Sequence, residues 1–99
     1  MSTTLTPPKE RLRRSGGDSG LGGSWRVIVL NDNHNTFEGV AFALSSTLPG
    51  VSYDAGMSMA NTIHSKGQAI VWTGAREPAE HYWELLKEAG LTMAPLEQG

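Results

Sequence analysis

The chain has 99 residues, a formal net charge of −2 and no cysteine. A chain of this length forms one domain with a modest core, and it has no stretch approaching the roughly 20 apolar residues of a membrane span. The lack of cysteine excludes disulfides, thiolate metal sites and thiol nucleophiles. It is also compatible with the cytosol, so we expect a cytoplasmic protein without membrane contacts.

Charge divides the chain in two: residues 1–23 carry four basic and two acidic side chains, whereas residues 24–99 carry four basic and eight acidic ones. The second part repels phosphates, so nucleic acid is not an expected partner. The first part has five glycines, a Pro pair and few apolar residues, and it cannot bury enough apolar surface to offset the entropy of ordering. An Arg-rich targeting peptide is the alternative, but its helix-compatible stretch over residues 9–14 is short. We therefore expect a disordered N-terminal extension over residues 1–23 and one folded domain over residues 24–99.

The first half of this domain predicts a strand, a polar turn and a helix. The stretch from Trp25 to Leu30 is dense in β-branched and apolar residues, which is typical of a strand buried in a sheet. A polar run ends the strand, and Asn35 is expected to cap a helix with Glu38 in its first turn. Apolar residues recur at helical spacing until a Pro-Gly pair stops this helix: Phe37, Val40, Ala41, Leu44 and Leu48.

The second half predicts a helix, a strand, a third helix and a short strand. Ser52 is expected to cap the second helix and Gly67 to end it. Residues 68–73 read as the second strand, and Pro78 suits the first turn of the third helix. Residues 91–96 form a short third strand. The order β-α-α-β-α-β predicts an α+β domain with a three-stranded antiparallel sheet and three helices that cover one face of it.

Motifs for catalysis are absent or misleading. Residues 17–20 (GDSG) resemble the nucleophile segment of trypsin-like proteases, but that fold needs two β-barrels and this chain is too short for them. The sequence has no P-loop, dinucleotide fingerprint or HExxH motif, and its three histidines lie far apart without an i, i+4 pair. We expect no enzyme activity, no metal site and no cofactor, and a small hydrolase is the weakest alternative.

The remaining chemistry is a polar turn and one histidine. Asn31 and Asp32 directly follow the predicted buried strand, and His64 lies near the end of the second helix on its apolar side. From spacing alone, a loop cap and a hydrogen-bonded core histidine are the more common explanation. A binding site at the rim of the core is the alternative.

Two segments of the chain resemble the ClpS adaptors of Clp proteases. Residues 29–33 (VLNDN), followed by Phe37 and Glu38, are similar to that family's apolar strand, Asn-Asp-Asp turn and capped helix. Residues 63–70 (IHSKGQAI) are similar to its Val-His-x-x-Gly-x-Ala segment. Residues 75–80 (AREPAE) also match a family pattern, and the resemblance covers about residues 25–97.

The resemblance implies an adaptor that captures proteins whose first residue is Leu, Phe, Tyr or Trp and delivers them to the N-terminal domain of a Clp AAA+ unfoldase. It implies that Asn31, Asp32 and His64 bind the N-terminal amine. A protonated amine has donors and no acceptor, so an amide carbonyl, a carboxylate and a neutral imidazole suit it. The implied side-chain pocket is lined by Asn35, Phe37, Val40, Ala43, Ala60, Ile63 and Thr92, and the implied unfoldase-facing residues are Glu77, Glu80 and Tyr82.

Three positions depart from the family pattern. Asn33 stands where the family has Asp, Phe37 where it usually has Met, and Tyr82 where it often has Lys. These departures bear on substrate range and partner identity. The C-terminal domain of the ribosomal stalk protein, which recruits translation factors, shares the element order and is the alternative, although it has no need of an amine site and usually shows a lysine-rich helical face.

Overall fold

The computed structural model describes residues 24–99, and the predicted extension over residues 1–23 lies outside the described residues. The expected α+β architecture is confirmed, with three helices and an antiparallel sheet. In chain order the elements are β1 (Trp25–Leu30), α1 (Phe37–Thr47), α2 (Tyr53–Lys66), β2 (Gln68–Gly74), α3 (Arg76–Glu88), β3 (Thr92–Met93) and β4 (Glu97–Gln98).

β1 is the centre of the sheet. On one side, β2 pairs with it antiparallel along its whole length. On the other side, β3 pairs with the second half of β1 and β4 with the first half, both antiparallel. The prediction of three strands missed β4. Because Pro95 has no N–H to donate, the strand predicted over residues 91–96 is reduced to β3, and pairing resumes only in β4.

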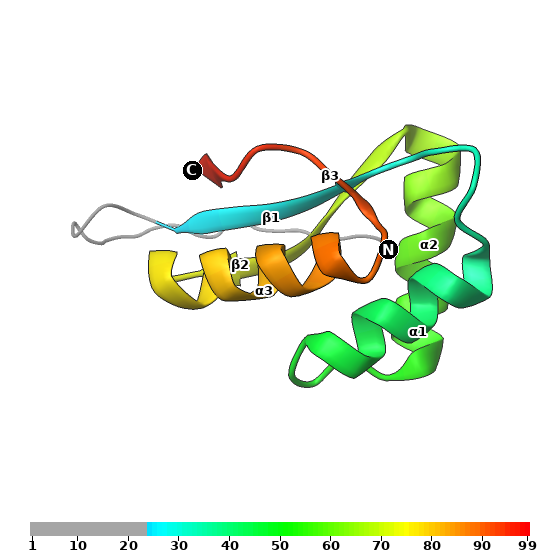
Figure 1. Cartoon of the computed structure of the whole chain (residues 1–99), viewed down its shortest axis with the longest axis horizontal. Coiled ribbons are helices and arrows are strands. Elements are labelled where there is room, and N and C mark those ends of the chain that lie inside the picture. Colours follow the sequence, from blue (N-terminus) through cyan, green and yellow to red (C-terminus); the bar gives the residue numbers. More distant parts are fainter. Residues whose placement is uncertain (1–23) are drawn as a thin grey trace.

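The helices cover one face and one end of the sheet (Figure 1). α3 lies along β1 and β2, and α1 and α2 pack together at the end where β1 leaves the sheet and β2 enters it. One core joins these parts, because the largest fully buried side chains come from β1, α1 with the residue after it, and α3: Val27, Val29, Leu44, Leu48 and Leu86.

α1 and α2 approach each other closely at Gly56. A Cβ atom at this position would lie 2.7 Å from the carbonyl oxygen of Ala41, a distance that real Cβ contacts do not show. Glycine therefore permits a backbone contact that any side chain would prevent. This contact fixes α2 against α1, and the last turn of α2 carries His64.

The helix ends follow the predicted caps with one exception. At the start of α2 the Ser52 side chain accepts a backbone N–H, and at its end Gly67 adopts the left-handed conformation with a φ of 90°. At the start of α1 the cap is Thr36, whose hydroxyl accepts the N–H of Gly39 at 2.9 Å. The prediction of Asn35 as this cap is wrong, because the Asn35 side chain donates to two groups in the preceding turn and in the α3–β3 connection.

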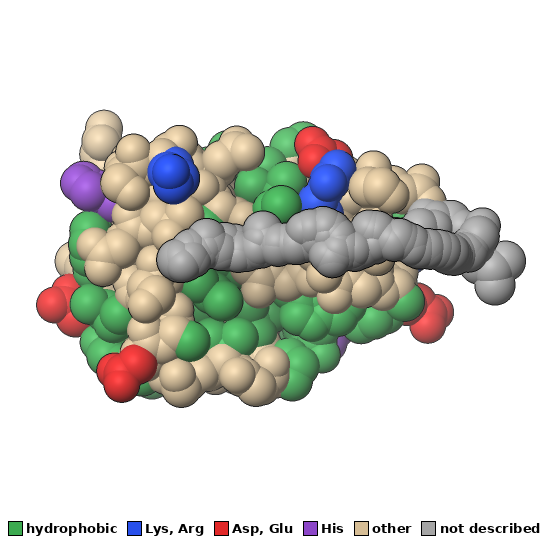
Figure 2. Space-filling view, turned by 180° about the vertical axis from the view of Figure 1, so that it is seen from behind, with side chains coloured by type: hydrophobic (Ala, Val, Ile, Leu, Met, Phe, Trp, Pro, Cys, Tyr) green, Lys and Arg blue, Asp and Glu red, His purple; other side chains and the backbone are tan. Residues whose placement is uncertain are grey.

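Within residues 24–99, no helix is long and apolar enough to cross a membrane. The same residues contain no group of three or more His, Cys, Asp or Glu side chains that could hold a metal ion. On the face opposite to that of Figure 1, charged side chains are scattered among hydrophobic and polar ones (Figure 2). The large hydrophobic side chains that remain exposed each lie on a different element: Phe42, Tyr53, Ile70 and Leu85.

Candidate binding site

A cavity of about 300 Å³ opens where β1 gives way to the turn before α1. Ligand pockets in proteins measure roughly 300–1,000 Å³, so this cavity suits a small group such as one side chain. Its walls come from β1, the turn, α1, α2 and the residue before β3: Val29, Leu30, Asn31, Asp32, Asn33, Asn35, Phe37, Val40, Ala60, Ile63, His64 and Leu91. The fold therefore brings the polar turn and the distant histidine to one cavity.

A backbone hydrogen bond joins the turn to the end of α2. The N–H of Asn31 donates to the carbonyl of Gly67 at 2.9 Å. Gly67 ends α2 and turns the chain into β2, and His64 lies in the last turn of the same helix. Because the glycine ties both segments together, Asn31 and His64 lie at one rim although they are far apart in the sequence.

His64 is exposed to solvent and borders the cavity. Its ring meets the ring of Phe37 edge-on, with 5.2 Å between the ring centroids and 61° between the ring planes. Edge-to-face contacts of this kind are favourable, so Phe37 helps to hold the imidazole in place. His64 is therefore not the buried core histidine that its spacing alone makes the common explanation.

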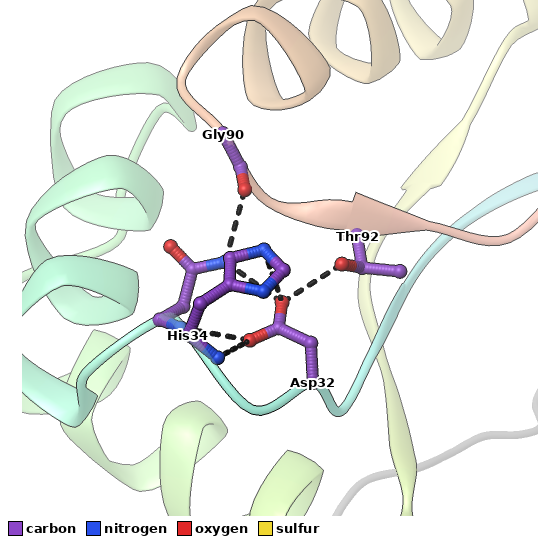
Figure 3. A network of polar contacts seen from close by, with 5 residues as sticks. Asp32, His34, Gly90 and Thr92 are labelled. Atoms are coloured by element: carbon purple, nitrogen blue, oxygen red, sulfur yellow. Dashed lines mark hydrogen bonds and ion pairs between the residues drawn. The ribbon is translucent and has the colours of Figure 1, made fainter.

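Asp32 is bonded by several donors of the chain (Figure 3). Its Oδ1 accepts the backbone N–H groups of His34 at 3.0 Å and Asn35 at 2.8 Å. Its Oδ2 accepts the side-chain amide of Asn35 at 2.7 Å and the hydroxyl of Thr92 at 2.8 Å. The same Asn35 amide also donates to the carbonyl of Gly90 at 2.9 Å. These bonds connect the turn to β3 and to the segment before it.

These contacts decide the acidity of Asp32. Its side chain is only 11% exposed, and this burial alone raises the pKa of the carboxyl. The hydrogen bonds from Asn35, Thr92 and His34 favour the ionised form and outweigh the burial, so the pKa lies well below the usual range of an aspartate. Asp32 is therefore a fixed negative charge beside the cavity at neutral pH.

Most of the residues predicted to form the side-chain pocket do line the cavity: Asn35, Phe37, Val40, Ala60 and Ile63. Ala43 is buried in the core and does not line it. Thr92 does not line it either, and its hydroxyl donates to Asp32.

Four lining residues were not predicted: Val29, Leu30, Asn33 and Leu91. The first three lie within two residues of the predicted residues Asn31 and Asp32, so their position in the sequence was a signal for them. Leu91 directly precedes Thr92, which was predicted as a pocket residue, so the same signal was present there. It reaches the cavity because Thr92 pairs with Leu30 in the sheet, a contact between the two ends of the domain.

The predicted unfoldase-facing residues lie on two sides of α3. Glu77 and Glu80 are exposed and border a second cavity of about 670 Å³, here called the acidic groove, together with His81, Trp83, Glu84, Pro95 and Leu96. Tyr82 instead packs edge-on against Trp72 of β2, with 5.0 Å between the ring centroids. With 3.6 residues per turn, Tyr82 falls on the side of α3 that also carries the buried Ala79 and Leu86.

Comparison with known protein families identifies the family to which the chain belongs. The family model for the ATP-dependent Clp protease adaptor protein ClpS matches residues 22–97. The chain belongs to the ClpS family. It is therefore an adaptor of the Clp protease and not the protease itself, and the ribosomal-stalk alternative is excluded.

Individual relatives agree with this assignment. The Clp protease adapter protein ClpS of Nostoc sp. is 53% identical over 74 residues, which are 75% of this chain and 76% of that protein. The protein of the same name from Thermosynechococcus vestitus is 51% identical over 74 residues, or 75% of this chain and 79% of that protein. Among solved structures, Agrobacterium tumefaciens ClpS2 bound to L-phenylalaninamide matches with a TM-score of 0.70 and 28% identity, covering 79% of this chain and 99% of that one.

Proposed function

We propose that this ClpS chain binds proteins through a bulky hydrophobic N-terminal residue, Leu, Phe, Tyr or Trp, and delivers them to the N-terminal domain of a Clp AAA+ unfoldase. The observation that carries the proposal is the composition of the cavity. Its walls combine buried apolar side chains with a carboxylate, amides and an imidazole, and among the described residues 24–99 no Lys or Arg lines it. Such a cavity suits a ligand that carries a positively charged group next to an apolar one.

The polar rim provides for the amine. A free α-amine has an ordinary pKa of about 7.7–8.0, so at pH 7 it is mostly a cation with donors and no acceptor. The side-chain oxygen of Asn31 and a ring nitrogen of neutral His64 are acceptors for it, and the fixed charge of Asp32 attracts it. An acetylated N-terminus lacks both the charge and two of the donors.

The apolar interior provides for the first side chain. Val40, Ala60, Ile63 and Leu91 are buried and line it. Full burial of a Leu or Phe side chain contributes roughly 1.5–3 kcal/mol, and each hydrogen bond to a charged group contributes roughly 1.5–3 kcal/mol. After the cost of association these terms support an affinity of about 1 µM, which suits an adaptor that must release its cargo.

The related A. tumefaciens structure supports the choice of ligand. Its ligand, L-phenylalaninamide, carries a free α-amine next to an aromatic side chain. This is the combination of groups that the cavity of the present chain favours.

Delivery requires contacts with the unfoldase as well. The acidic groove on α3, with Glu77 and Glu80 on its border, is the proposed docking face for the unfoldase N-terminal domain. Tyr82 does not line this groove, and its half-buried ring packs edge-on against Trp72. Residues 1–23 are the proposed segment that engages the unfoldase during hand-over.

The proposal is tested by titrating the protein with a Leu-initiated peptide and with the same peptide acetylated at its N-terminus. Loss of the charge and donors should weaken binding at least about tenfold. Equal affinities for the two peptides would rule out an N-terminal amine site. Deletion of residues 1–23 should leave peptide affinity unchanged and abolish delivery in a reconstituted degradation assay, and normal delivery would refute the role of this segment.

A further inference from the structure

The carboxylate of Asp32 already accepts hydrogen bonds from four donors within residues 24–99. A carboxylate offers about four lone-pair sites. Four donors of the chain occupy them: the N–H of His34, the N–H and side-chain amide of Asn35, and the hydroxyl of Thr92. The side chain is also only 11% exposed. An incoming amine would have to displace one of these donors to bond Asp32.

The same bonds hold two walls of the cavity together. The Asn35 amide bridges the Asp32 carboxylate and the Gly90 carbonyl, and the Thr92 hydroxyl reaches the same carboxylate from β3. Leu91 lies between Gly90 and Thr92, is buried and lines the cavity. The network therefore fixes the turn that carries the amine acceptors relative to the apolar wall that meets the first side chain.

We propose that Asp32 is a positioning residue, with Thr92 and Asn35 as its partners in holding the turn. In this arrangement Asn31 and His64 make the hydrogen bonds to the ligand amine, and Asp32 acts on the amine through its charge and its hold on the turn. The proposal rests on the proposed function, since it concerns the same amine site. Thr92 then holds the turn through Asp32, whereas the family resemblance implies that it lines the side-chain pocket.

Thr92→Val separates positioning from direct binding because it removes one donor and nearly preserves the shape of the side chain. If Asp32 bonded the amine directly, this variant would free a lone pair, and a Leu-initiated peptide would bind as tightly as before or more tightly. If Asp32 positions the turn, affinity falls by up to about tenfold, because a hydrogen bond to a charged group contributes roughly 1.5 kcal/mol toward holding the turn in its binding geometry. Thr92→Ser keeps the hydroxyl and should restore the wild-type affinity. Unchanged or tighter binding by Thr92→Val overturns the proposal.

Asp32→Asn completes a double-mutant cycle. If Thr92 acts through Asp32, the effect of Thr92→Val on peptide affinity largely disappears in the Asp32→Asn background, whereas additive effects overturn the coupling. The unfolding curve of each variant is measured first, and affinities are compared under conditions where all variants are folded. This comparison separates a loss of binding caused by unfolding from one caused by displacement of the turn.

Amide hydrogen exchange tests the network without any peptide. Thr92→Val should speed exchange at the N–H groups of His34 and Asn35, which are bonded to Asp32, and Thr92→Ser should not. Unchanged exchange in Thr92→Val refutes the positioning role. Equal binding of the free and acetylated peptides would instead refute the proposed function, so the two failures are distinguishable.

Discussion

The cavity at the end of β1 and the acidic groove on α3 differ in how their charges are held. Asp32 in the cavity is nearly buried and accepts hydrogen bonds from four donors of the chain. In the groove, Glu77 and Glu84 are exposed and form no ion pair within residues 24–99, and Glu80 pairs only with Arg76 of the same helix, at 3.0 Å.

This difference predicts two kinds of recognition. A pre-organised site loses little freedom on binding and discriminates by geometry. Exposed charges attract a partner over a distance and are screened by salt. We therefore expect the cavity to select its ligand by hydrogen bonds and shape, and the groove to contribute charge-dependent docking.

The largest effect is expected when an amine acceptor of the cavity is removed. Asn31→Ala should weaken binding of a Leu-initiated peptide by about 10- to 100-fold, because each hydrogen bond to a charged group contributes roughly 1.5–3 kcal/mol. Asn61→Ala is the matched control, since Asn61 is exposed on α2 and does not line the cavity. Affinity measured by calorimetry that stays within about twofold of wild type in Asn31→Ala would remove Asn31 from the amine site.

The hydrogen-bonded, nearly buried charge of Asp32 should also affect the stability of the protein at acid pH. The pKa of Asp32 is lowered in the folded state, so its stabilising effect is complete above the ordinary aspartate pKa of about 3.9 and is lost as the pH falls from there through the lowered pKa. Between pH 5 and pH 2.5, wild type should therefore lose more stability than Asp32→Asn, as measured by urea unfolding. The same loss in Asp32→Asn as in wild type would show that the network does not stabilise the fold.

The sequence was sufficient where a structural feature depends on neighbouring residues. The cap at Ser52, the left-handed end at Gly67 and the strand Trp25–Leu30 all follow from local chemistry, and all are present. The cap of α1 was misplaced because Asn35 and Thr36 are both good caps. The Gly90 carbonyl, which the fold brings close, draws the Asn35 side chain away from the helix. A sequence pattern does not contain that contact.

The candidate site shows the same limit. The family resemblance named Asn31, Asp32 and His64, and the structure places all three at one cavity, while their roles toward an amine stay predictions. Thr92 was named as a pocket wall, yet its hydroxyl is bonded to Asp32, 60 residues away in the sequence. Residue types identify which groups are suited to an amine, but only the packing shows which of them are already bonded within the fold.

A smaller and salt-dependent effect is expected in the acidic groove. Replacing both Glu77 and Glu84 by Gln should weaken binding to an unfoldase N-terminal domain by about three- to tenfold in 50 mM salt, because exposed pairs contribute roughly 0.2–1 kcal/mol each. The effect should nearly vanish in 0.5 M salt, and peptide affinity should not change. The control replaces Glu38 and Glu88, which are exposed and lie outside the groove. An equal loss in both double variants would indicate a general effect of net charge and not a docking groove.

The smallest effect is expected for the selectivity of the cavity, which depends on Phe37. This residue lines the cavity and contacts His64 edge-on. Methionine is unbranched and polarizable and adapts to different ligands, whereas phenylalanine presents a flat, rigid ring. Wild type should therefore prefer aromatic first residues over β-branched ones by about two- to tenfold, since aromatic pairing contributes roughly 0.5–1.5 kcal/mol beyond burial.

Affinities of wild type and Phe37→Met for peptides beginning with Phe, Leu and Ile decide how Phe37 acts. If its ring contacts the ligand, the difference in affinity between the peptides beginning with Phe and with Ile is smaller for Phe37→Met than for wild type. If the ring only supports His64, all three peptides lose affinity by the same factor and their ranking stays as in wild type. Phe42→Met is the matched control, because Phe42 is 67% exposed on α1 and does not line the cavity. Unchanged ranking and spread in Phe37→Met would show that Phe37 does not select the ligand, and the cavity would then discriminate through its apolar interior alone.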